Sequence, residues 1–307
     1  AAFMTDLRKI ELRDISIPCP GPEHVLIKLE YVGICSSDIH YLENGRIGDF
    51  IVQGDFILGH ECAGTVVKLG EGVKNLKERD RVALEPGCTC GKCEFCKTGR
   101  YNLCPDVKFL ATPPYAGCLE NYIVFPEDMC FKLPENVSTK EGALIEPLAV
   151  GLHAAKQGGV TLGSHVTILG AGCIGLVTLL ACKALGATDI TVVDIIPKRL
   201  RFAEKLGATR VIDGKEADTI REIEKVTDGK GSDIVIETAG ASATIQQTPY
   251  IVKRGGTVVL VGMAPEDIIP FNFSKIMAKE AEVKTVFRYQ NIYPIAIEAL
   301  RKGLINI

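Results

Sequence analysis

The sequence predicts an α/β protein with a doubly wound parallel sheet, preceded by an irregular, β-rich domain. Three observations predict this architecture. From about residue 149 onward, strand-like and helix-like segments alternate; the first of these strands runs into a glycine-rich turn; and residues 1–148 contain short strand-like runs separated by Pro and Gly. A chain of 307 residues has room for two such domains.

The first domain, residues 1–148, is predicted from strand-like runs at 25–32, 64–68 and 81–84. Turn-forming residues separate these runs, namely Pro18, Pro20, Gly21 and Pro22, and later Gly70 and Gly72. Residues 86–106, rich in cysteine, interrupt the pattern and are predicted to form a loop that leaves the β domain.

In the second half, apolar runs that suit buried strands are each followed by a helical segment. The predicted strands are 165–170, 189–194, 210–213, 233–237, 257–262 and 283–287. The predicted helices are 173–186, 197–206, 216–227, 242–252, 274–279 and 293–301. Because strands that alternate with helices usually pair in parallel, this order predicts a Rossmann-type sheet.

The composition narrows the choice of partners. Charged residues make up 24% of the chain, the net charge is −3, and no basic block occurs, so we expect no nucleic acid partner. Residues 158–182 carry no charge, but they include six glycines and change from a strand-like to a helix-like pattern. We therefore expect a buried strand and helix there, and no membrane partner.

The cysteines point to a metal rather than to disulfides. Four of the twelve, Cys90, Cys93, Cys96 and Cys104, follow the spacing C-x2-C-x2-C-x7-C. Four thiolates so placed can complete a tetrahedral zinc shell within one loop. Because Cys104-Pro105 is like the end of a ferredoxin motif, an iron–sulfur cluster is an alternative to zinc. The x7 gap and the lack of a second cluster motif argue against this alternative. This usage favours a reducing, cytoplasmic compartment.

A dinucleotide-binding turn is predicted at Gly170-Ala-Gly172-Cys-Ile174-Gly175, after an apolar strand and before a helix. Gly170 permits the tight turn, Gly172 lets a pyrophosphate approach the backbone, and Gly175 allows close packing of the helix. The free N–H groups at the start of that helix would face the phosphates.

Asp194 ends the next predicted strand, nineteen residues after Gly175. A carboxylate at this place accepts hydrogen bonds from an adenosine ribose and repels a 2′-phosphate, which favours NAD over NADP. Lys198 and Arg199 lie nearby and could serve a phosphate instead. With Asp194 present, we expect NAD as the cofactor.

A second metal site is possible in the first domain. Cys35, His60 and a glutamate are of the types that bind zinc, and three protein ligands would leave one position open for chemistry. No single segment shows metal spacing here, and a lone His60 is more often a structural histidine. The residues alone therefore do not decide whether Cys35, His60 and a glutamate bind a metal.

Taken together, the motifs resemble the zinc-dependent medium-chain dehydrogenases. The resemblance rests on Gly59-His60-Glu61 followed by Gly64, on the cysteine loop, and on the dinucleotide turn. It is closest to the sorbitol (polyol) dehydrogenase branch, through residues 33–35, Tyr41, 45–48, 99–103, 111–114, 142–148 and 286–289. It covers essentially the whole chain.

The resemblance implies a fold and a set of metal ligands. It implies a GroES-like catalytic domain at 1–148, an NAD-binding domain at 149–290, and a return to the catalytic domain from 291 to 307. It also implies a catalytic zinc on Cys35, His60 and Glu61, with Glu146 bound directly or through water, and a structural zinc on the four cysteines. The chain opens without an initiating Met, and family members continue for several tens of residues beyond 307, so the resemblance implies either a trimmed sequence or a fragment.

Further residue roles follow from the same resemblance. Ser37 and His40 would relay the hydroxyl proton, and Glu146 would act beside the metal. The polyol would be bound by Tyr41, Phe109, Glu146, Arg288 and Tyr289. The cofactor would be bound by Gly170, Gly172, Ile174, Gly175, Asp194, Arg199, Val261, Gly262, Met263, Val286, Phe287 and Arg288.

The implied function is oxidation of a secondary polyol hydroxyl, from sorbitol or xylitol, with hydride transfer to NAD by a zinc-dependent homo-oligomer, a tetramer or dimer. Zinc would lower the pKa of the hydroxyl and the nicotinamide would take the hydride. Two alternatives stay open: a butanediol or L-threonine dehydrogenase of the same family, and a non-enzymatic zinc or redox protein.

Overall fold

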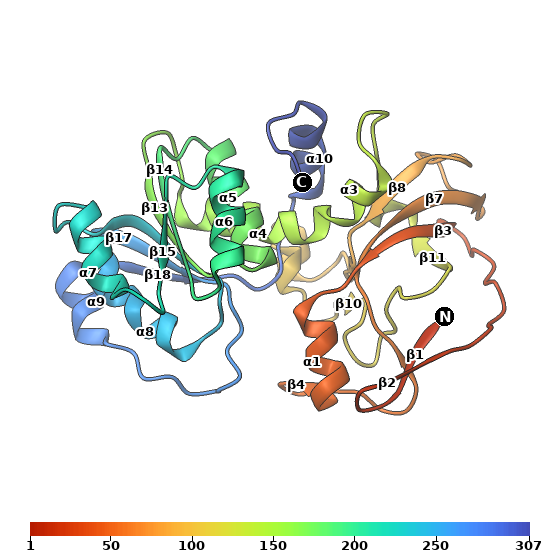
Figure 1. Ribbon diagram of the computed structural model, residues 1–307. Coiled ribbons are helices and arrows are strands. Elements are labelled where there is room, and N and C mark those ends of the chain that lie inside the picture. Colours follow the sequence, from red (N-terminus) through yellow and green to blue (C-terminus); the bar gives the residue numbers. More distant parts are fainter. The chain divides into compact units, whose positions relative to one another are not determined.

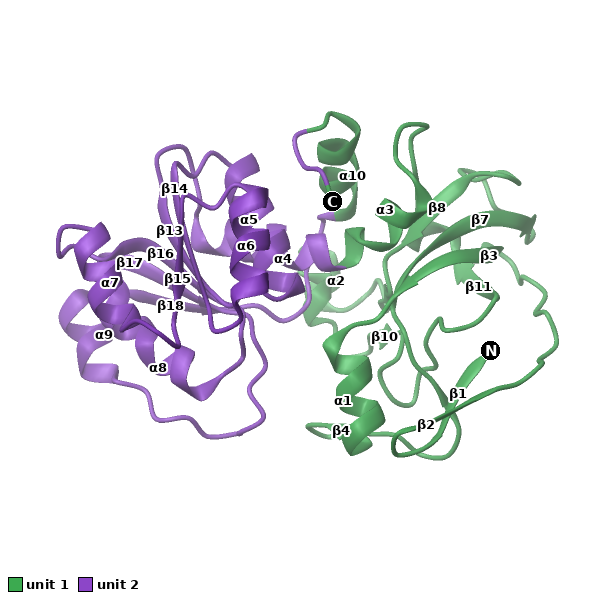
Figure 2. Ribbon diagram, viewed as in Figure 1, with its two compact units in different colours: residues 1–146, 293–303, 307 green, residues 147–292, 304–306 purple.

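The computed structural model describes all residues from 1 to 307 and divides the chain into two compact units (Figure 2). The first unit comprises residues 1–146, 293–303 and 307; the second comprises residues 147–292 and 304–306. The fold class predicted from the sequence is confirmed, since one unit is β-rich and the other contains a parallel sheet with helices.

The first unit is built on a five-stranded antiparallel sheet in the order β11-β3-β7-β8-β12 (Figure 1). The strands are β3 (His24–Gly33), β7 (Glu61–Leu69), β8 (Arg81–Leu84), β11 (Tyr122–Pro126) and β12 (Cys130–Lys132). Alternate side chains of these strands, among them Val25, Ile27, Val66, Val82 and Phe125, form its core.

Short strands and helices complete this unit. The strands are β1 (Ala2–Asp6), β2 (Lys9–Leu12), β4 (Arg46–Ile47), β5 (Phe50–Ile51), β6 (Phe56–Ile57), β9 (Gly87–Cys88) and β10 (Lys108–Phe109). The helices are α1 (Ser36–Asn44), α2 (Glu94–Lys97), α3 (Thr139–Ala143) and α10 (Tyr293–Arg301), with 3-10 turns at Tyr101–Leu103 and Glu127–Met129. Helix α10 joins the first unit because the Tyr293 hydroxyl donates to the carbonyl of Leu84 at 2.7 Å.

The second unit contains a six-stranded sheet in the order β15-β14-β13-β16-β17-β18, parallel throughout. Its strands are β13 (His165–Leu169), β14 (Asp189–Asp194), β15 (Arg210–Asp213), β16 (Ser232–Glu237), β17 (Val252–Leu260) and β18 (Glu282–Thr285). Helices α5 (Cys173–Ala184), α6 (Pro197–Leu206), α7 (Thr219–Val226), α8 (Ser242–Ile251) and α9 (Phe273–Lys279) lie on both sides of it (Figure 1). The strand order reverses between β13 and β16, where such sheets bind ligands.

The predicted elements agree with the observed ones to within a few residues, except at the start of β17. Helices α1 and α4 (Ile145–Gly158) were not predicted. Helix α4 was not predicted because it is apolar and buried on nearly every side, so it lacks a polar stripe. Strand β17 begins at Val252 rather than 257, since Val252 already pairs with Ser232 across a register shift. No helix combines the length and the apolar character needed to cross a membrane.

Candidate active site and metal centres

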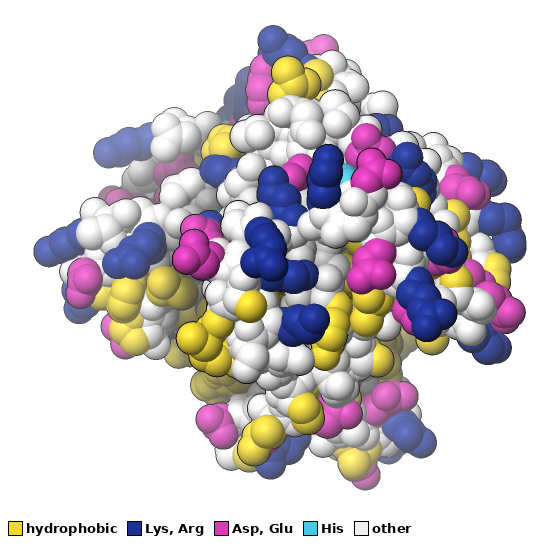
Figure 3. Space-filling model, turned by 90° about the vertical axis from the view of Figure 1, so that its left-hand side faces the viewer, with side chains coloured by type: hydrophobic (Ala, Val, Ile, Leu, Met, Phe, Trp, Pro, Cys, Tyr) yellow, Lys and Arg dark blue, Asp and Glu magenta, His cyan; other side chains and the backbone are white.

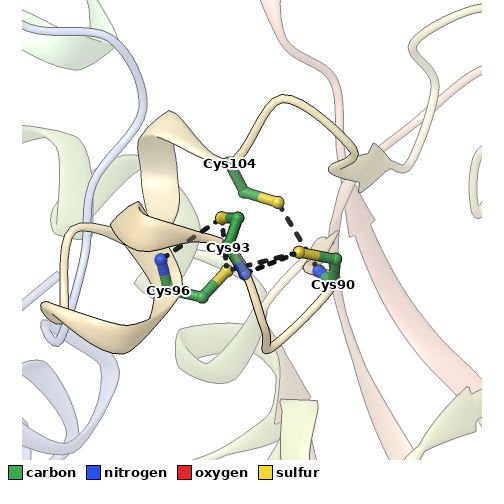
Figure 4. Close-up of side chains that lie close together, drawn as sticks. All are labelled: Cys90, Cys93, Cys96 and Cys104. Carbon is green, nitrogen blue, oxygen red and sulfur yellow. Dashed lines mark hydrogen bonds between the residues drawn. The ribbon is translucent and has the colours of Figure 1, made fainter.

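The loop between β9 and β10 gathers the four predicted cysteines into one cluster. Their sulfur atoms all lie within 4.8 Å of one another (Figure 4). The distance between the Sγ atoms of Cys93 and Cys96 is 3.4 Å, and that between Cys90 and Cys96 is 4.0 Å. Such a compact set of thiols, none of them in a disulfide, matches the donor set of a closed zinc site.

Backbone N–H groups around this cluster point at the sulfurs. The amide of Cys93 donates to the Sγ of Cys90, and the amide of Cys96 donates to the Sγ of Cys93, each at 3.4 Å. Amides of Lys92 and Cys93 lower the pKa of Cys90 to about 7. At Cys93 the amide of Cys96 is outweighed by burial and by the thiols of Cys96 and Cys90, which raise the pKa to about 11. Without metal, Cys90 is therefore the thiol of this pair that ionises first. Cys88 lies outside the cluster, and burial raises its pKa to about 11.

A second group of metal-binding side chains lies where β3 and β7 pair. Cys35 caps the N-terminus of α1, Glu61 begins β7, and His60 directly precedes that strand. One ligand atom from each lies within 4.8 Å of the other two. Gly33 pairs with Glu61, and a Cβ at residue 33 would lie 2.0 Å from Oε2 and 2.9 Å from Cβ of Glu61, so a larger residue would displace the Glu61 side chain. Spacing in the sequence could not reveal this group, because the antiparallel pairing brings its members together.

Asp38 holds the elements of this group in place. Its Oδ2 accepts from the amide of Cys35 and its Oδ1 from the amide of Gly59, both at 2.9 Å. Oδ1 also lies 3.7 Å from Nδ1 of His60. Burial opposes ionisation of Asp38, but His60 and the two amides outweigh it and lower its pKa. Such a carboxylate orients a metal-binding histidine and selects its tautomer.

The electrostatics of the group fit a divalent cation. In the protein without metal, burial first and the charge of Glu146 second raise the pKa of Glu61 to about 7. For His60, burial is outweighed by Asp38, Cys35 and Glu146, which raise its pKa well above the usual range. Sulfur, nitrogen and carboxylate donors beside further negative charge suit zinc, and three ligands leave a position open.

Glu146 lies in the first turn of α4 and is 5% exposed. Its charge acts on His60 and Glu61, yet the compact three-residue group does not include it. The structure therefore places Glu146 beside the group of Cys35, His60 and Glu61.

The other predicted residues of the first unit differ in exposure. On α1, Ser37 is half-buried and His40 is exposed. Tyr41 is buried in an apolar cluster with Met4, Phe56 and Leu58. The ring of Phe109 lies 5.8 Å from the ring of His60, centroid to centroid.

The predicted dinucleotide turn connects β13 to α5. Gly170 has a φ of +104°, which favours glycine. A Cβ at Gly175 would lie 1.9 Å from the carbonyl oxygen of Gly170, whereas a Cβ at Gly172, the N-cap of α5, would meet open space. Ile174 is half-buried in the first turn of α5. The turn thus offers exposed backbone at the start of a helix, as a pyrophosphate requires.

Asp194 ends β14 and supports this turn. Its Oδ2 accepts from the amide of Ala171 at 2.7 Å, and its Oδ1 accepts from the amide of Ile196 at 2.8 Å. A carboxylate has about four acceptor positions, so about two are left for a ribose. The guanidinium of Arg199 lies 3.8 Å from Oδ2.

The remaining predicted residues follow β17 and β18. The amides of Val261 and Gly262 donate to the carbonyl of Glu237 at 2.9 and 3.1 Å, and the amide of Val286 donates to that of Leu260 at 2.9 Å. Met263 is exposed.

The last three predicted residues are adjacent in the chain and belong to the second unit, whereas Tyr41 and Phe109 belong to the first. Phe287 is exposed, and the guanidinium of Arg288 stacks over its ring at 4.7 Å from the centroid. Tyr289 is buried.

Among the buried acidic residues that were not predicted, Asp38 and Glu237 lie beside the predicted sites. Asp38 stands three residues after Cys35, the spacing of a helix capping box, and Glu237 is an acidic residue that ends an apolar strand. Either pattern is a weak signal, because surface carboxylates show it as well.

A sulfur–nitrogen–carboxylate group in a β unit, together with a dinucleotide turn in a parallel sheet, defines a metal-dependent oxidoreductase of the alcohol dehydrogenase type. Comparisons with known proteins agree. Residues 21–135 match the alcohol dehydrogenase GroES-like domain, and residues 173–302 match the zinc-binding dehydrogenase family. The chain belongs to the zinc-dependent medium-chain dehydrogenases, in their sorbitol dehydrogenase branch.

Two curated relatives illustrate this membership. The uncharacterized zinc-type alcohol dehydrogenase-like protein YdjJ of Escherichia coli is 52% identical, over 95% of this chain and 84% of its own. The sorbitol dehydrogenase of Bacillus subtilis is 46% identical, over 100% of this chain and 87% of its own.

Solved structures show the same fold. An Escherichia coli oxidoreductase of unknown specificity, described as involved in membrane biogenesis, superposes with a TM-score of 0.96 at 49% identity, over 100% of this chain and 88% of that one. A zinc-binding dehydrogenase of Sinorhizobium meliloti bound to NADP has a TM-score of 0.91 at 32% identity, over 100% of this chain and 89% of that one. Zinc and a nicotinamide dinucleotide are therefore the cofactors of this chain.

Proposed function

We propose that this protein oxidises a secondary hydroxyl of a polyol, such as sorbitol or xylitol, and transfers the hydride to NAD. The observation that carries the proposal is the compact group of half-buried Cys35 with buried His60 and Glu61, with the charge of Glu146 beside it. Similarity to sorbitol dehydrogenases, at 46% identity over the whole chain in the Bacillus protein, supports this substrate class.

The residues of the first unit would hold the catalytic metal and move the proton. When bound, zinc would act as a Lewis acid on the substrate hydroxyl, and NAD would accept the hydride from the carbon bearing it. Ser37 and His40 stand three residues apart on α1, so their side chains share one face, the first half-buried and the second exposed. We infer that they carry the hydroxyl proton outward, from the Ser37 hydroxyl to the His40 ring.

Polyol binding would use side chains that exchange hydrogen bonds with several hydroxyls. We assign it to Tyr41, Phe109, Glu146, Arg288 and Tyr289. Tyr41, Arg288 and Tyr289 would donate, the Glu146 carboxylate would accept, and Phe109 would form an apolar wall. The guanidinium of Arg288 has five N–H donors, and its stacking on Phe287 limits its freedom. A site with several donors discriminates strongly against a simple alcohol, because such an alcohol leaves them unpaired.

Cofactor binding would use the dinucleotide turn and the segments after β17 and β18. We assign the pyrophosphate to the turn of Gly170, Gly172, Ile174 and Gly175, and the adenosine ribose to Asp194, with Arg199 beside it. Val261, Gly262, Met263, Val286, Phe287 and Arg288 would flank the nicotinamide. The free acceptor positions on Asp194 support NAD over NADP.

A substrate panel tests the proposal. Purified protein would be assayed with NAD and with NADP on sorbitol, xylitol, 2,3-butanediol, L-threonine and ethanol. We expect kcat/KM for sorbitol or xylitol with NAD to exceed that for ethanol by at least about tenfold. A highest value for butanediol or threonine would assign the chain to a sister activity, and a coloured protein that reduces no dinucleotide would support the redox alternative.

We also propose that the protein forms homo-oligomers in the cytoplasm. Strand β18 is the edge of its sheet and its Val283 is exposed, as are Met263 after β17 and Phe273 and Met277 of α9, which packs on β17. On the face in Figure 3, apolar side chains lie among charges of both signs. None of the twelve cysteines is in a disulfide, which supports a reducing compartment. Light scattering coupled to size exclusion would give the subunit number, and a monomer at micromolar concentration would refute association.

A further inference from the structure

Glu237 occupies an unusual position in the second unit. It is the last residue of β16, a central strand of the parallel sheet, and its exposed fraction is 0%. Its Oε1 accepts from the amides of Ala239 and Gly240 at 3.0 Å, and the Thr244 hydroxyl lies 2.7 Å from the same atom. A buried carboxylate is costly, so its retention at this place calls for a reason.

The hydrogen bonds of Glu237 organise two loops. The carboxylate binds residues 239–240 of the β16–α8 turn, whereas its backbone carbonyl accepts from the amides of Val261 and Gly262 after β17. These loops touch backbone to backbone: a Cβ at Gly262 would lie 2.1 Å from the amide nitrogen of Gly240 and 2.8 Å from Glu237 Oε2. Glu237 therefore binds both loops, one through its backbone carbonyl and the other through its carboxylate.

The β16–α8 turn also contacts the dinucleotide turn. The Thr238 hydroxyl donates to the carbonyl of Leu169 at 2.9 Å or of Gly170 at 3.1 Å. A Cβ at Gly170 would lie 2.8 Å from the amide nitrogen of Ala239. Residues 238–240 thus lie between the Gly170 turn and residues 261–263, at the carboxyl ends of β13, β16 and β17.

No cation neutralises this carboxylate. Burial raises the pKa of Glu237, and the Thr244 hydroxyl and the amides of Gly240, Ala239 and Ala241 oppose the shift. These donors, in the β16–α8 turn and the first turn of α8, stabilise the ionised form. Removal of the negative charge should therefore loosen these donors, and movement of the donors should destabilise the ionised carboxylate.

We propose that Glu237 is a positioning residue for the dinucleotide cofactor: it fixes residues 238–240 so that the Gly170 turn and residues 261–263 keep the spacing that the cofactor needs. The inference rests on the proposed function, which assigns both of these loops to the cofactor. Glu237 itself would touch neither substrate nor zinc. Loss of the Glu237 carboxylate should therefore weaken binding of the dinucleotide and leave the rate of the chemical step unchanged.

The test compares Glu237→Gln with Asp233→Asn in the full-length, zinc-loaded protein. Asp233 is a matched control, because it lies near the opposite end of the same strand and its carboxylate accepts from the amide of His165 at 2.7 Å and from Lys253. The dissociation constants of NADH and NADPH would be measured by fluorescence titration. Amide hydrogen exchange at residues 239–240 and 261–262 would be followed without cofactor.

We expect Glu237→Gln to raise the dissociation constant of the dinucleotide that the wild type prefers by roughly 5- to 20-fold. Amide exchange at 239–240 should speed up, while zinc content and kcat at saturating dinucleotide stay within about twofold. Asp233→Asn should lower the melting temperature and leave the dissociation constant within about twofold. Equal weakening by both variants, or an unchanged constant in Glu237→Gln, would overturn the inference. Wild type that binds neither dinucleotide would refute the proposed function instead.

If Glu237→Gln does not fold, Thr244→Ala removes one donor and keeps the carboxylate. Thr244→Ala should raise the dissociation constant of the dinucleotide by roughly two- to fivefold. Thr244→Ser keeps the hydroxyl and should have the wild-type dissociation constant. Identical constants for the Ala and Ser variants would contradict the role given to Glu237.

Discussion

The Oδ1 atom of Asp38 lies 3.7 Å from Nδ1 of His60, and the same carboxylate accepts hydrogen bonds from the amides of Cys35 and Gly59. One side chain thus supports two of the three members of the candidate catalytic metal group. Loss of such a support commonly costs a metal site 10- to 100-fold in affinity, in round figures.

Asp38→Asn should therefore weaken zinc binding at this group by about 10- to 100-fold, because the neutral amide no longer attracts the His60 ring. Zinc retained after dialysis against graded chelator gives the affinity. Glu43→Gln, on the exposed side of the same helix, is the control and should bind zinc as the wild type does. If both variants retain the same zinc, Asp38 does not support the metal.

The two metal groups should respond differently to loss of a ligand. His60→Ala should abolish turnover and leave the fold intact, because it removes a ligand from the open site. Cys96→Ala should first lower the melting temperature, because it breaks the closed four-cysteine cluster. Elemental analysis should give about two zinc ions per wild-type chain. A single zinc, with all four cysteines reactive toward a thiol reagent, would refute the structural site.

Asp194→Ala should weaken the use of NAD by about 10- to 100-fold and admit NADP, because a charged acceptor is removed while Arg199 loses its partner. The amides of Ala171 and Ile196 also lose their acceptor, so some stability should be lost. Asp189→Asn, at the start of the same strand, controls for this loss, since Asp189 pairs with the exposed Arg210. The ratio of kcat/KM for NAD to that for NADP is the readout. Wild type that prefers NADP would contradict the assignment.

Replacement of Arg288 should damage polyol oxidation by about 10- to 100-fold, through loss of donors to the hydroxyls. Arg288 has a φ of +59°, so Arg288→Asn is a better variant than Arg288→Ala, because Asn tolerates this conformation. The kcat/KM for sorbitol should fall far more than that for ethanol, with a much smaller effect on the dissociation constant for NADH. An equal fall for both alcohols would show that Arg288 serves only the cofactor or the fold.

Glu85 should make stability depend on pH. It is buried, accepts from the Tyr101 hydroxyl at 2.7 Å, and burial raises its pKa from 4.5 to about 7. Because its folded pKa is raised, its contribution to stability is full below about pH 4.5 and is lost as the pH rises through about 7.

Glu85→Gln cannot ionise and its carbonyl can still accept from Tyr101. Relative to the wild type, its free energy of unfolding should therefore rise between pH 5 and pH 8 by about 2 kcal/mol. Urea unfolding at the two pH values measures this difference. Tyr101→Phe should show the opposite trend, since it removes the donor that favours the ionised form. Parallel pH profiles for wild type and Glu85→Gln would refute the assignment.

Local patterns in the sequence determined much of this protein. The alternation of strands and helices after residue 149 predicted the parallel sheet, because burial imposes a period on each segment. The four cysteines lie within fifteen residues, so their spacing alone indicated a cluster. The turn from Gly170 to Gly175 needs backbone conformations that glycine adopts most easily, so the glycines themselves predict the turn.

Tertiary structure alone decided what depends on contacts between distant residues. Cys35 meets His60 and Glu61 only because β3 pairs with β7, and no local period records that pairing. Helix α4 escaped prediction because burial on nearly every side removed its polar stripe. Asp38 forms a hydrogen bond with Gly59, and Glu237 forms hydrogen bonds with residues 261–262. In both cases the partners are more than twenty residues apart in the sequence. Strand pairing and packing create such contacts, whereas a sequence pattern reports only on neighbours along the chain.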